Sequence, residues 1–321
     1  MNNDFISILR DRLPRSSEPF FEKEYGEKTA ITLPVKNGSI GLPKGVSRGQ
    51  NVLNLLFELL DPLNKIKDFS KLPIPFYCIA TDVETGGTVL LEKGPLPLAL
   101  RASGSFPTLL NPVTLNDKML VDGGIANNFP VSIMKSKGMD IIIGVDVEGR
   151  LYQRDKLTSV LSIMNQIISY QMYSKTDAEK DKLDIYIHPE IFDFNVVDFD
   201  KKDEILQKGI DEGLKYRSVF EEIAAKQKTK KKRVVKEVTN NKFLISEIGT
   251  AGIKNYTRAY ILGKLKIREG DSLSRKEITE RIYLLSASKN YDRIEYSINK
   301  KENNSYRLDF ILNENNDKAN L

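Results

Sequence analysis

The sequence predicts an α/β layered domain followed by a small β-α-α-β-β domain. Strands alternate with helices up to about residue 226, which is the pattern of α/β proteins. Residues 140–147, Asp-Ile-Ile-Ile-Gly-Val-Asp-Val, form a continuous apolar run typical of a parallel strand covered on both faces. The pattern changes after residue 242, where a strand, two helices and a hairpin follow one another up to residue 313. We therefore expect two domains of different architecture.

Length and composition agree with this reading. The chain has 321 residues, of which 40% are hydrophobic and 29% charged, as in soluble globular proteins of about two domains. A single cysteine, Cys78, and a single histidine, His188, exclude an internal disulfide framework and a Cys/His zinc site. They also exclude a Ser-His-Asp triad unless His188 is the base. No metal and no cofactor are expected.

The positive charge of the chain is local. Lys226 to Lys236 contains seven basic residues and no acidic one, and without these seven the net charge of +5 would become −2. Such a run is typical of a solvated linker, while contact with anionic lipid or nucleic acid is the alternative. We favour the linker, and we expect no nucleic-acid partner.

The chain shows no targeting or membrane-spanning pattern. The first residues, Met1-Asn-Asn-Asp-Phe, lack a basic region followed by an apolar stretch, so we expect no signal peptide here. No run of 18 apolar residues occurs, so we expect no transmembrane helix.

The elements of the first domain follow from apolar periodicity and turn residues. Predicted strands are 30–35, 74–81, 88–92, 113–115, 118–121, 140–147 and 185–188. Predicted helices are 52–60, 96–103, 131–137, 156–174 and 201–226. Residues 52–60 are apolar nearly all round, which predicts a buried helix. Asn116-Asp117 predicts a hairpin turn whose second strand ends at Asp122.

The second domain begins with a strand at 243–249 and a helix at 257–265. Ser274-Arg-Lys-Glu277 is a capping-box pattern that opens a helix ending at Ser286. Two alternating segments joined at Asn303-Asn304 predict a hairpin. The predicted domains are 1–227 and 242–313, separated by a basic linker at 228–241 and followed by a polar tail at 314–321.

The candidate site is Asp122-Gly123-Gly124, at the end of the strand 118–121. A carboxylate at a strand end, followed by a glycine-rich turn, is a common place for chemistry in α/β enzymes. Glycine allows a positive φ or a close approach of the backbone. The alternative is a tight turn in which Asp122 caps the helix that starts near Pro130.

A second candidate is Ser47, in Gly45-Val-Ser-Arg-Gly49, which matches the nucleophile-elbow pattern G-x-S-x-G. The elbow requires a strand directly before the serine and a helix after it. Pro43 argues against a strand before it, so a loop that caps the next helix is the preferred interpretation.

Residues from about 33 to 147 resemble the C-terminal half of bacterial patatin-like phospholipases. The resemblance lies in Ile74-Pro-Phe-Tyr-Cys-Ile-Ala-Thr-Asp82, Ala99-Leu-Arg-Ala-Ser103 with Pro107, Asp122-Gly-Gly-Ile-Ala-Asn-Asn-Phe-Pro130 and Gly144-Val-Asp146. Residues 242–313 resemble a POTRA module. Together they resemble self-secreting outer-membrane phospholipases, in which a β-barrel follows the POTRA domain. This implies a three-layer α/β/α patatin-like sandwich, incomplete at its N-terminus, followed by a POTRA-like domain.

The resemblance implies a Ser-Asp dyad without histidine, with Asp122 as the acid that orients and deprotonates the serine. It also implies a serine elbow and an oxyanion turn that precede the matched region, and neither turn is found in these 321 residues. We therefore expect a fragment, a misassigned start or a split gene, inactive alone. Ser47 aligns downstream of the expected elbow.

Four other polar residues attract attention because of their positions. Asp82 and Asp146 end predicted strands, and cap or turn roles are favoured for both. His188, before Pro189, is interpreted as a structural or exposed histidine. Ser103, at a helix end, is assigned to packing and capping.

Two functions follow from these observations. The first is a lipid acyl hydrolase of phospholipase A type that acts on a phospholipid or another lipid ester. The second is a non-catalytic binding protein whose POTRA-like module accepts an extended segment at a strand edge. The resemblance implies a location at the periplasmic face of the bacterial outer membrane, with a β-barrel or the membrane surface as partner.

Overall fold

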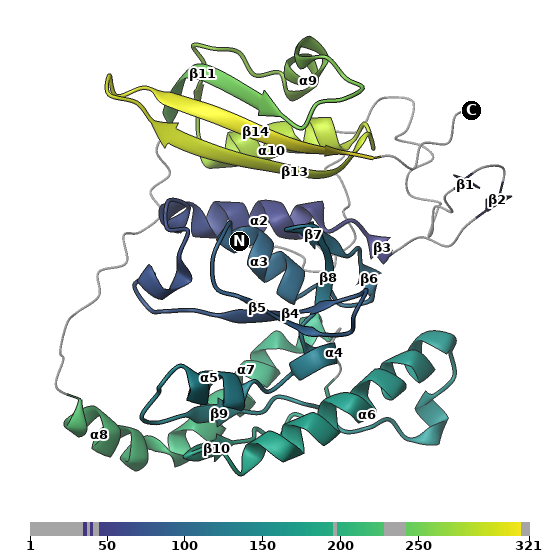
Figure 1. Ribbon diagram of the computed structural model, residues 1–321, viewed down its shortest axis with the longest axis vertical. Helices are drawn as coiled ribbons and strands as arrows, with labels where there is room; N and C mark the ends of the chain where they lie inside the picture. Colours follow the sequence, from purple (N-terminus) through teal and green to yellow (C-terminus); the bar gives the residue numbers. More distant parts are fainter. Residues whose placement is uncertain (1–34, 37–38, 41–44, 195–197, 228–241, 316–321) are drawn as a thin grey trace. The chain divides into compact units, whose positions relative to one another are not determined.

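The computed structural model describes residues 35–36, 39–40, 45–194, 198–227 and 242–315, and it has mixed α/β structure (Figure 1). The chain divides into two compact units. The first comprises Met1–Cys78, Leu91–Val121 and Lys236–Leu321, and the second comprises Ile79–Leu90 and Asp122–Val235. The predicted linker 228–241 lies outside the described residues, so the predicted domain boundaries and the three-layer sandwich stay predictions.

The first unit begins with short strands and a helix. β1 (Val35–Lys36) and β2 (Ser39–Ile40) pair antiparallel, and of the predicted strand 30–35 only the last residue lies in the described part. β3 (Gly45–Ser47) pairs in parallel with β6 (Thr108–Leu110) and leads into α2 (Gln50–Leu60). Neither β3 nor β6 was predicted, because three-residue strands carry no periodic pattern.

The hairpin that leads to Asp122 is confirmed. β7 (Val113–Leu115) pairs antiparallel with β8 (Lys118–Asp122), and the turn residues Asn116 and Asp117 have φ of 50° and 59°. Two consecutive left-handed residues define the hairpin turn that asparagine and aspartate favour. α3 (Leu96–Ser103) is also confirmed, with its proline in the first turn.

The C-terminal part of the first unit is a four-stranded sheet with two helices (Figure 1). The strand order is β12-β11-β14-β13, with β11 parallel and β13 antiparallel to β14. Its elements are β11 (Phe243–Ala251), α9 (Arg258–Leu265), β12 (Ser272–Leu273), α10 (Arg275–Ser286), β13 (Tyr291–Lys300) and β14 (Tyr306–Glu314). The predicted hairpin and the Ser274–Glu277 capping box are confirmed, and β12 is an additional strand. We call residues 242–315 the C-terminal module.

The core of the first unit joins the C-terminal module to α2 and α3. Leu53 and Phe57 of α2 and Leu98 of α3 belong to the same buried cluster as Ile245, Ile282 and Phe310 of the module. α2 is not buried all round, however, because Leu59 is 59% exposed. The apolar residues of this helix therefore form one buried face, as in an amphipathic helix.

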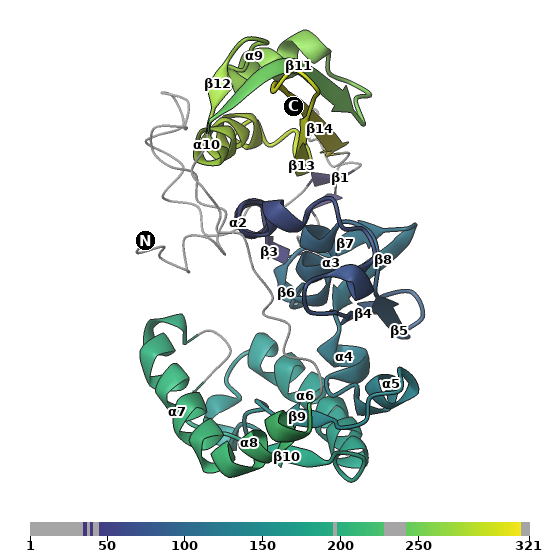
Figure 2. The same ribbon diagram turned by 90° about the vertical axis from the view of Figure 1, so that its left-hand side faces the viewer.

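The second unit contains the remaining strands and helices. Its strands are β4 (Cys78–Asp82), β5 (Thr88–Leu91), β9 (Ile143–Val145) and β10 (Ile185–Ile187). Its helices are α4 (Gly124–Asn127), α5 (Val131–Ser136), α6 (Val160–Lys180), α7 (Lys202–Lys215) and α8 (Arg217–Lys226). β9 and β10 pair in parallel, and α5 and α6 contact each other (Figure 2).

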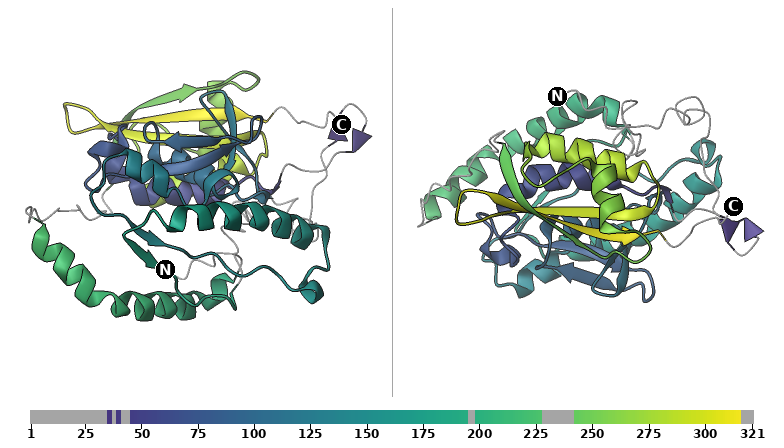
Figure 3. Two further views of the ribbon diagram at one scale, coloured as in Figure 1. Left: turned by 60° about the horizontal axis from the view of Figure 1, so that its bottom comes forward. Right: turned by 90° about the horizontal axis from the view of Figure 1, so that it is seen from above.

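Two predictions for the second unit were wrong. The predicted strand 140–147 shortens to β9, and its Ile143 and Val145 side chains are 42% and 51% exposed, so it is not covered on both faces in the described structure. Ile142 faces the opposite way and packs with Phe129 and Val131. The predicted helix 201–226 divides at Tyr216 into α7 and α8, seen as consecutive green segments in Figure 3.

Candidate active site

Asp122 is the last residue of β8 and stands directly before α4. Its side chain is half-buried, and one carboxylate oxygen, Oδ1, accepts a hydrogen bond from the backbone N–H of Gly124 at 2.8 Å. Asp122 therefore holds the start of α4 and not, as the alternative interpretation had it, the helix near Pro130. The N-cap of that second helix, α5, has no side-chain hydrogen bond.

The two glycines are needed for close approach and not for a positive φ. Gly123 has φ −66° and ψ −27°, which any residue can adopt. A Cβ on Gly123 would lie 2.1 Å from the carbonyl oxygen of Ile79, and one on Gly124 would lie 2.7 Å from Asn128 Oδ1. The backbone of the turn thus packs directly on β4, which leaves no room for a side chain.

Thr81 fixes the backbone of the turn. Its hydroxyl donates to the carbonyl oxygen of Asp122 at 2.7 Å and accepts from the N–H of Ala126 at 3.1 Å. The side chain is buried, so both contacts are shielded from water. Sequence reasoning missed this residue, although a threonine inside the apolar run that ends at Asp82 was a usable signal.

Burial raises the pKa of the Asp122 carboxyl above its ordinary value, and the hydrogen bond from Gly124 only partly opposes this. A raised pKa makes the carboxylate a stronger base. Among the described residues, no hydroxyl group hydrogen-bonds to this carboxylate. The arrangement can therefore accept a proton from a group placed beside it.

The far end of the turn is attached to α6 through Glu148. The side-chain amide of Asn128 donates to Glu148 Oε1 at 2.6 Å, and the hydroxyl of Thr176 donates to the same oxygen at 2.7 Å. Lys175 Nζ donates to the carbonyl oxygen of Ala126 at 2.6 Å, near the C-terminal end of α4. These contacts hold α4 against the long helix.

Glu148 also lines a pocket of about 610 Å³ in the second unit. Its wall contains the aromatic side chains of Tyr170, Tyr173 and Phe192, together with His188. Burial, with a smaller effect of the Glu148 carboxylate, raises the pKa of Tyr173 to about 12, so its hydroxyl is protonated at neutral pH. The volume lies in the range of small-molecule sites.

The other carboxylates and the histidine have the predicted structural roles. Asp82 Oδ1 accepts from the N–H of Glu84, and Asp146 Oδ1 accepts from the N–H of Glu148, so both support turns. Asp146 Oδ2 also accepts from the hydroxyl of Tyr186 at 2.6 Å. His188 donates from Nδ1 to the carbonyl oxygen of Asp146 at 3.0 Å. Among the described residues, no group of three or more His, Cys, Asp and Glu side chains could hold a metal ion.

Ser47 lies in the first unit and is the last residue of the three-residue strand β3, shortly before α2 begins at Gln50. Residues 41–44, where Pro43 argues against a strand, lie outside the described residues. The serine is only 3% exposed, and its Oγ accepts from the N–H of Gly49 at 2.9 Å. A nucleophile on an elbow is exposed, whereas this hydroxyl is enclosed and shapes the turn before α2. Ser103 is the last residue of α3, in keeping with a role at the helix end.

Part of the chain is similar to proteins of known families. Residues 4–135 match the family model described as patatin-like phospholipase. An uncharacterized NTE family protein of Mycobacterium tuberculosis is 30% identical over 105 residues, which cover 33% of this chain and 28% of that protein. The lysophospholipase NTE1 of Meyerozyma guilliermondii is 31% identical over 171 residues, covering 45% of this chain and 12% of the fungal protein.

A third relative is similar to this chain at nearly the same identity and coverage. The lysophospholipase NTE1 of Pyricularia oryzae is 32% identical over 178 residues, covering 47% of this chain and 12% of the relative. The chain thus spans less than a third of the length of these relatives. Among the helices of the described residues, none is both long and apolar enough to cross a membrane. The chain carries a patatin-like phospholipase region, with homologues among the NTE family proteins.

Proposed function

We propose that this chain supplies the acid of a lipid acyl hydrolase of phospholipase A type. In this proposal, Asp122 orients a serine hydroxyl and takes its proton as the serine attacks the ester carbonyl. The observation that carries it is the half-buried Asp122 carboxylate at the end of β8, whose pKa burial raises. Asp122 also falls inside the patatin-like region, residues 4–135.

The rigid surroundings of Asp122 support this role. A catalytic base must be held in a fixed place, because small displacements cost much of the rate. Thr81 holds the carbonyl of Asp122, Gly124 holds the carboxylate, and Glu148 holds Asn128 at the end of the turn. Glu148 also lines the aromatic pocket, so the turn that begins at Asp122 is connected to the wall of this pocket through Asn128 and Glu148.

The chain of residues 1–321 is expected to be inactive alone, because no hydroxyl among the described residues hydrogen-bonds to the Asp122 carboxylate. Purified protein should hydrolyse p-nitrophenyl butyrate and phosphatidylglycerol vesicles no faster than its Asp122→Ala variant. Activity that disappears in both Asp122→Ala and Ser47→Ala would make Ser47 the nucleophile and overturn this part of the proposal.

The role of Asp122 itself is tested in any preparation of this chain that hydrolyses these esters. Asp122→Asn keeps an oxygen for the Gly124 N–H but cannot accept the serine proton, and loss of a group that acts with its nucleophile removes most of the rate. The control is Asp117→Asn, on the exposed turn between β7 and β8, where asparagine suits the left-handed φ of 59°. Ester hydrolysis that survives Asp122→Asn would refute the proposal. Attachment to an outer membrane stays a prediction.

A further inference from the structure

β13 is an edge strand of the sheet in the C-terminal module, and part of its open side is already bound by another element of the chain. β13 is the last strand in the order β12-β11-β14-β13, so one side of it has no neighbouring strand in the described structure. An edge strand presents backbone N–H and C=O groups that can pair with another segment. In β13, the groups of Ile294 are bound instead by a side chain of α2.

Gln50 pairs with Ile294 as a neighbouring strand would. Its amide Nε2 donates to the carbonyl oxygen of Ile294 at 2.9 Å, and its Oε1 accepts from the N–H of Ile294 at 2.8 Å. The side chain is 7% exposed, so both bonds are shielded from water. Nε2 also donates to Asn54 Oδ1 at 2.8 Å, which fixes the orientation of the amide.

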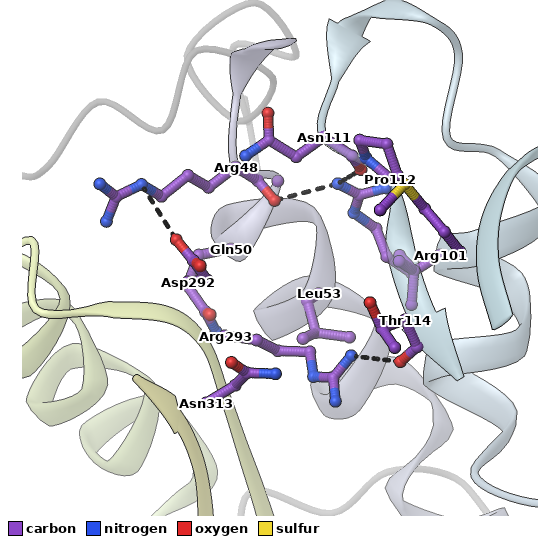
Figure 4. Close-up of a pocket in the computed structure, with 13 residues that line it drawn as sticks. Arg48, Gln50, Leu53, Arg101, Asn111, Pro112, Thr114, Asp292, Arg293 and Asn313 are labelled. Atoms are coloured by element: carbon purple, nitrogen blue, oxygen red, sulfur yellow. Dashed lines mark hydrogen bonds and ion pairs between the residues drawn. The ribbon is translucent and has the colours of Figure 1, made fainter. Parts of the chain in front are cut away.

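Two arginines bind backbone carbonyls across the same contact, and Figure 4 shows one of these bonds, from Arg293 to Thr114. Arg48 Nη1 donates to the carbonyl oxygen of Tyr291 at 3.0 Å and to that of Lys289 at 3.2 Å. In the opposite direction, Arg293 Nη1 of β13 donates to the carbonyl oxygen of Thr114 at 2.9 Å. Arg48, Arg293 and Gln50 line a polar pocket of about 130 Å³. In Figure 4, the guanidinium groups of the two arginines point to different partners, Asp292 and Thr114. Arg48 and Arg293 therefore make separate contacts between the C-terminal module and the rest of the unit, and their guanidinium groups do not form a common anion site.

An apolar contact lies beside the polar one. Leu53 and Phe57, on the same face of α2 as Gln50, are 2% and 3% exposed, and both belong to the core cluster of the module. The ring of Phe57 lies 5.3 Å from that of Tyr296, two residues beyond Ile294 on β13. Burial of such side chains is the main source of stability in a contact of this kind.

On the opposite side of the sheet, β12 pairs with β11 only at Phe243 and Leu244, so β11 is itself the edge strand at Ile248. On β11, the N–H of Ile248 donates to Glu269 Oε1 at 3.3 Å, and Arg258 Nη2 donates to the carbonyl oxygen of Ile248 at 2.9 Å. Arg258 and Glu269 form an ion pair at 3.3 Å. Both edges therefore have a residue whose N–H and C=O are bound by side chains of the same chain.

We infer that α2 is the docking element of the C-terminal module and that Gln50 is a latch that closes the β13 edge. The module is held on residues 48–57, and β13 accepts no extended partner segment at Ile294 while Gln50 is bound. This inference is independent of the proposed hydrolase. It bears on the alternative function, because strand addition at this edge requires Gln50 to leave first.

The test uses the whole chain, cleaved after folding. A site for a specific protease is inserted within residues 228–241, the protein is cleaved, and the two halves are examined by size-exclusion chromatography and titration. Docked halves elute together. Gln50→Ala leaves two backbone groups of Ile294 without partners, so the dissociation constant of the halves should rise roughly tenfold to a hundredfold. Separation of the wild-type halves would overturn the inference.

The matched control is Gln207→Ala on α7, an exposed glutamine whose amide donates to Asp211. It should leave the dissociation constant unchanged, and a Gln50→Ala variant that behaves in the same way would exclude the latch. Should Gln50→Ala fail to fold, Gln50→Glu keeps the shape and the acceptor but removes the donor. Hydrogen exchange gives a second readout in uncleaved protein. The Ile294 amide should exchange at least about tenfold faster in Gln50→Ala, which lacks its acceptor, while amides bonded to β14 keep their protection. Unchanged exchange at Ile294 would equally contradict the latch.

Discussion

The close approach of the Asp122 turn to β4 makes Gly123→Ala the most informative single change. Alanine suits the φ of −66° at this position, so the backbone conformation carries no penalty. The new Cβ, however, would lie 2.1 Å from the carbonyl oxygen and 2.5 Å from the carbonyl carbon of Ile79. Favourable contacts between such atoms begin at about 3.5 Å. The turn or the strand must therefore move by about an ångström or more.

The cost follows from what that movement breaks. Overpacking a rigid interior costs about 1–3 kcal/mol, and more where the obstacle cannot turn aside. Here the obstacle is strand backbone, and separation of the turn from β4 also pulls Asp122 away from the Thr81 hydroxyl. We expect Gly123→Ala to lower the free energy of unfolding by about 3 kcal/mol, the upper end of that range.

The control is Gly209→Ala in α7, where a Cβ would meet no heavy atom within 4 Å. Alanine in a helix is more favourable than glycine by about 0.8–1 kcal/mol, so this variant should be slightly more stable than the wild type. Urea denaturation followed by circular dichroism measures both. If the two variants unfold at free energies within about 1 kcal/mol of each other, the close-approach argument is refuted.

Two further changes test the polar contacts of the turn. Thr81→Val keeps the shape but leaves the Asp122 carbonyl without its hydroxyl donor, while the Ala126 N–H keeps its bond to the Gly123 carbonyl. The change should cost about 1–3 kcal/mol of unfolding free energy, against about zero for the exposed Thr88→Val on β5, and equal melting temperatures would contradict this. Burial raises the pKa of Asp122, so the folded protein binds this proton more tightly than the unfolded chain, and stability is lost as pH rises past the unfolded value of about 3.9. The stability of Asp122→Asn relative to wild type should therefore be greater at pH 7 than at about pH 3.5 in urea denaturation, and a difference independent of pH would show that the carboxyl is not desolvated.

Local sequence rules predicted the elements that local interactions determine. Asn116-Asp117 predicted a hairpin because both residues tolerate the left-handed φ that its turn requires. Ser274 and Glu277 predicted a helix start because each side chain binds the backbone of the other residue, and both bonds are present. These rules need no knowledge of what the element packs against, so they hold inside any fold.

Features that depend on distant parts of the chain could not be read in this way. Residues 140–147 are apolar throughout, and this pattern cannot tell which face a neighbouring element covers. The structure buries Ile142 and leaves Ile143 and Val145 exposed among the described residues. The break at Tyr216 was missed for a similar reason, since the hydroxyl of Tyr216 donates to the carbonyl of Tyr186, a strand residue 30 positions earlier. The spacing of apolar residues along a helix does not depend on that contact and cannot predict it.

The strand end that carries Asp122 was predicted, whereas its role as a site stays a hypothesis. Asp122 lies at a strand end, as expected, and the comparison places it within the patatin-like region. The role of Gly123 follows from the position of Ile79, 44 residues earlier in the chain, which no spacing rule includes. The catalytic role of Asp122 and the alternative role of Ser47 as nucleophile remain hypotheses for the experiments above.

The contacts that sequence reasoning missed share one physical form. In each, a buried polar side chain binds one backbone N–H group and one backbone C=O group. Thr81 does this at the Asp122 turn, and Gln50 does it at Ile294, 244 positions away. Buried backbone groups must be paired, so a fold that leaves them open needs such a side chain.

The sequence does contain a signal for these contacts, which is a polar residue on an otherwise apolar face. Gln50 and Asn54 share the buried face of α2 with Leu53 and Phe57, where a polar residue is costly unless it is bonded. Thr81 likewise interrupts an apolar strand. A polar residue on an otherwise apolar face therefore indicates backbone to be bound elsewhere, even when the sequence cannot say where. By this rule, the position of Gln50 among leucine and phenylalanine side chains indicates that α2 docks on another part of the chain.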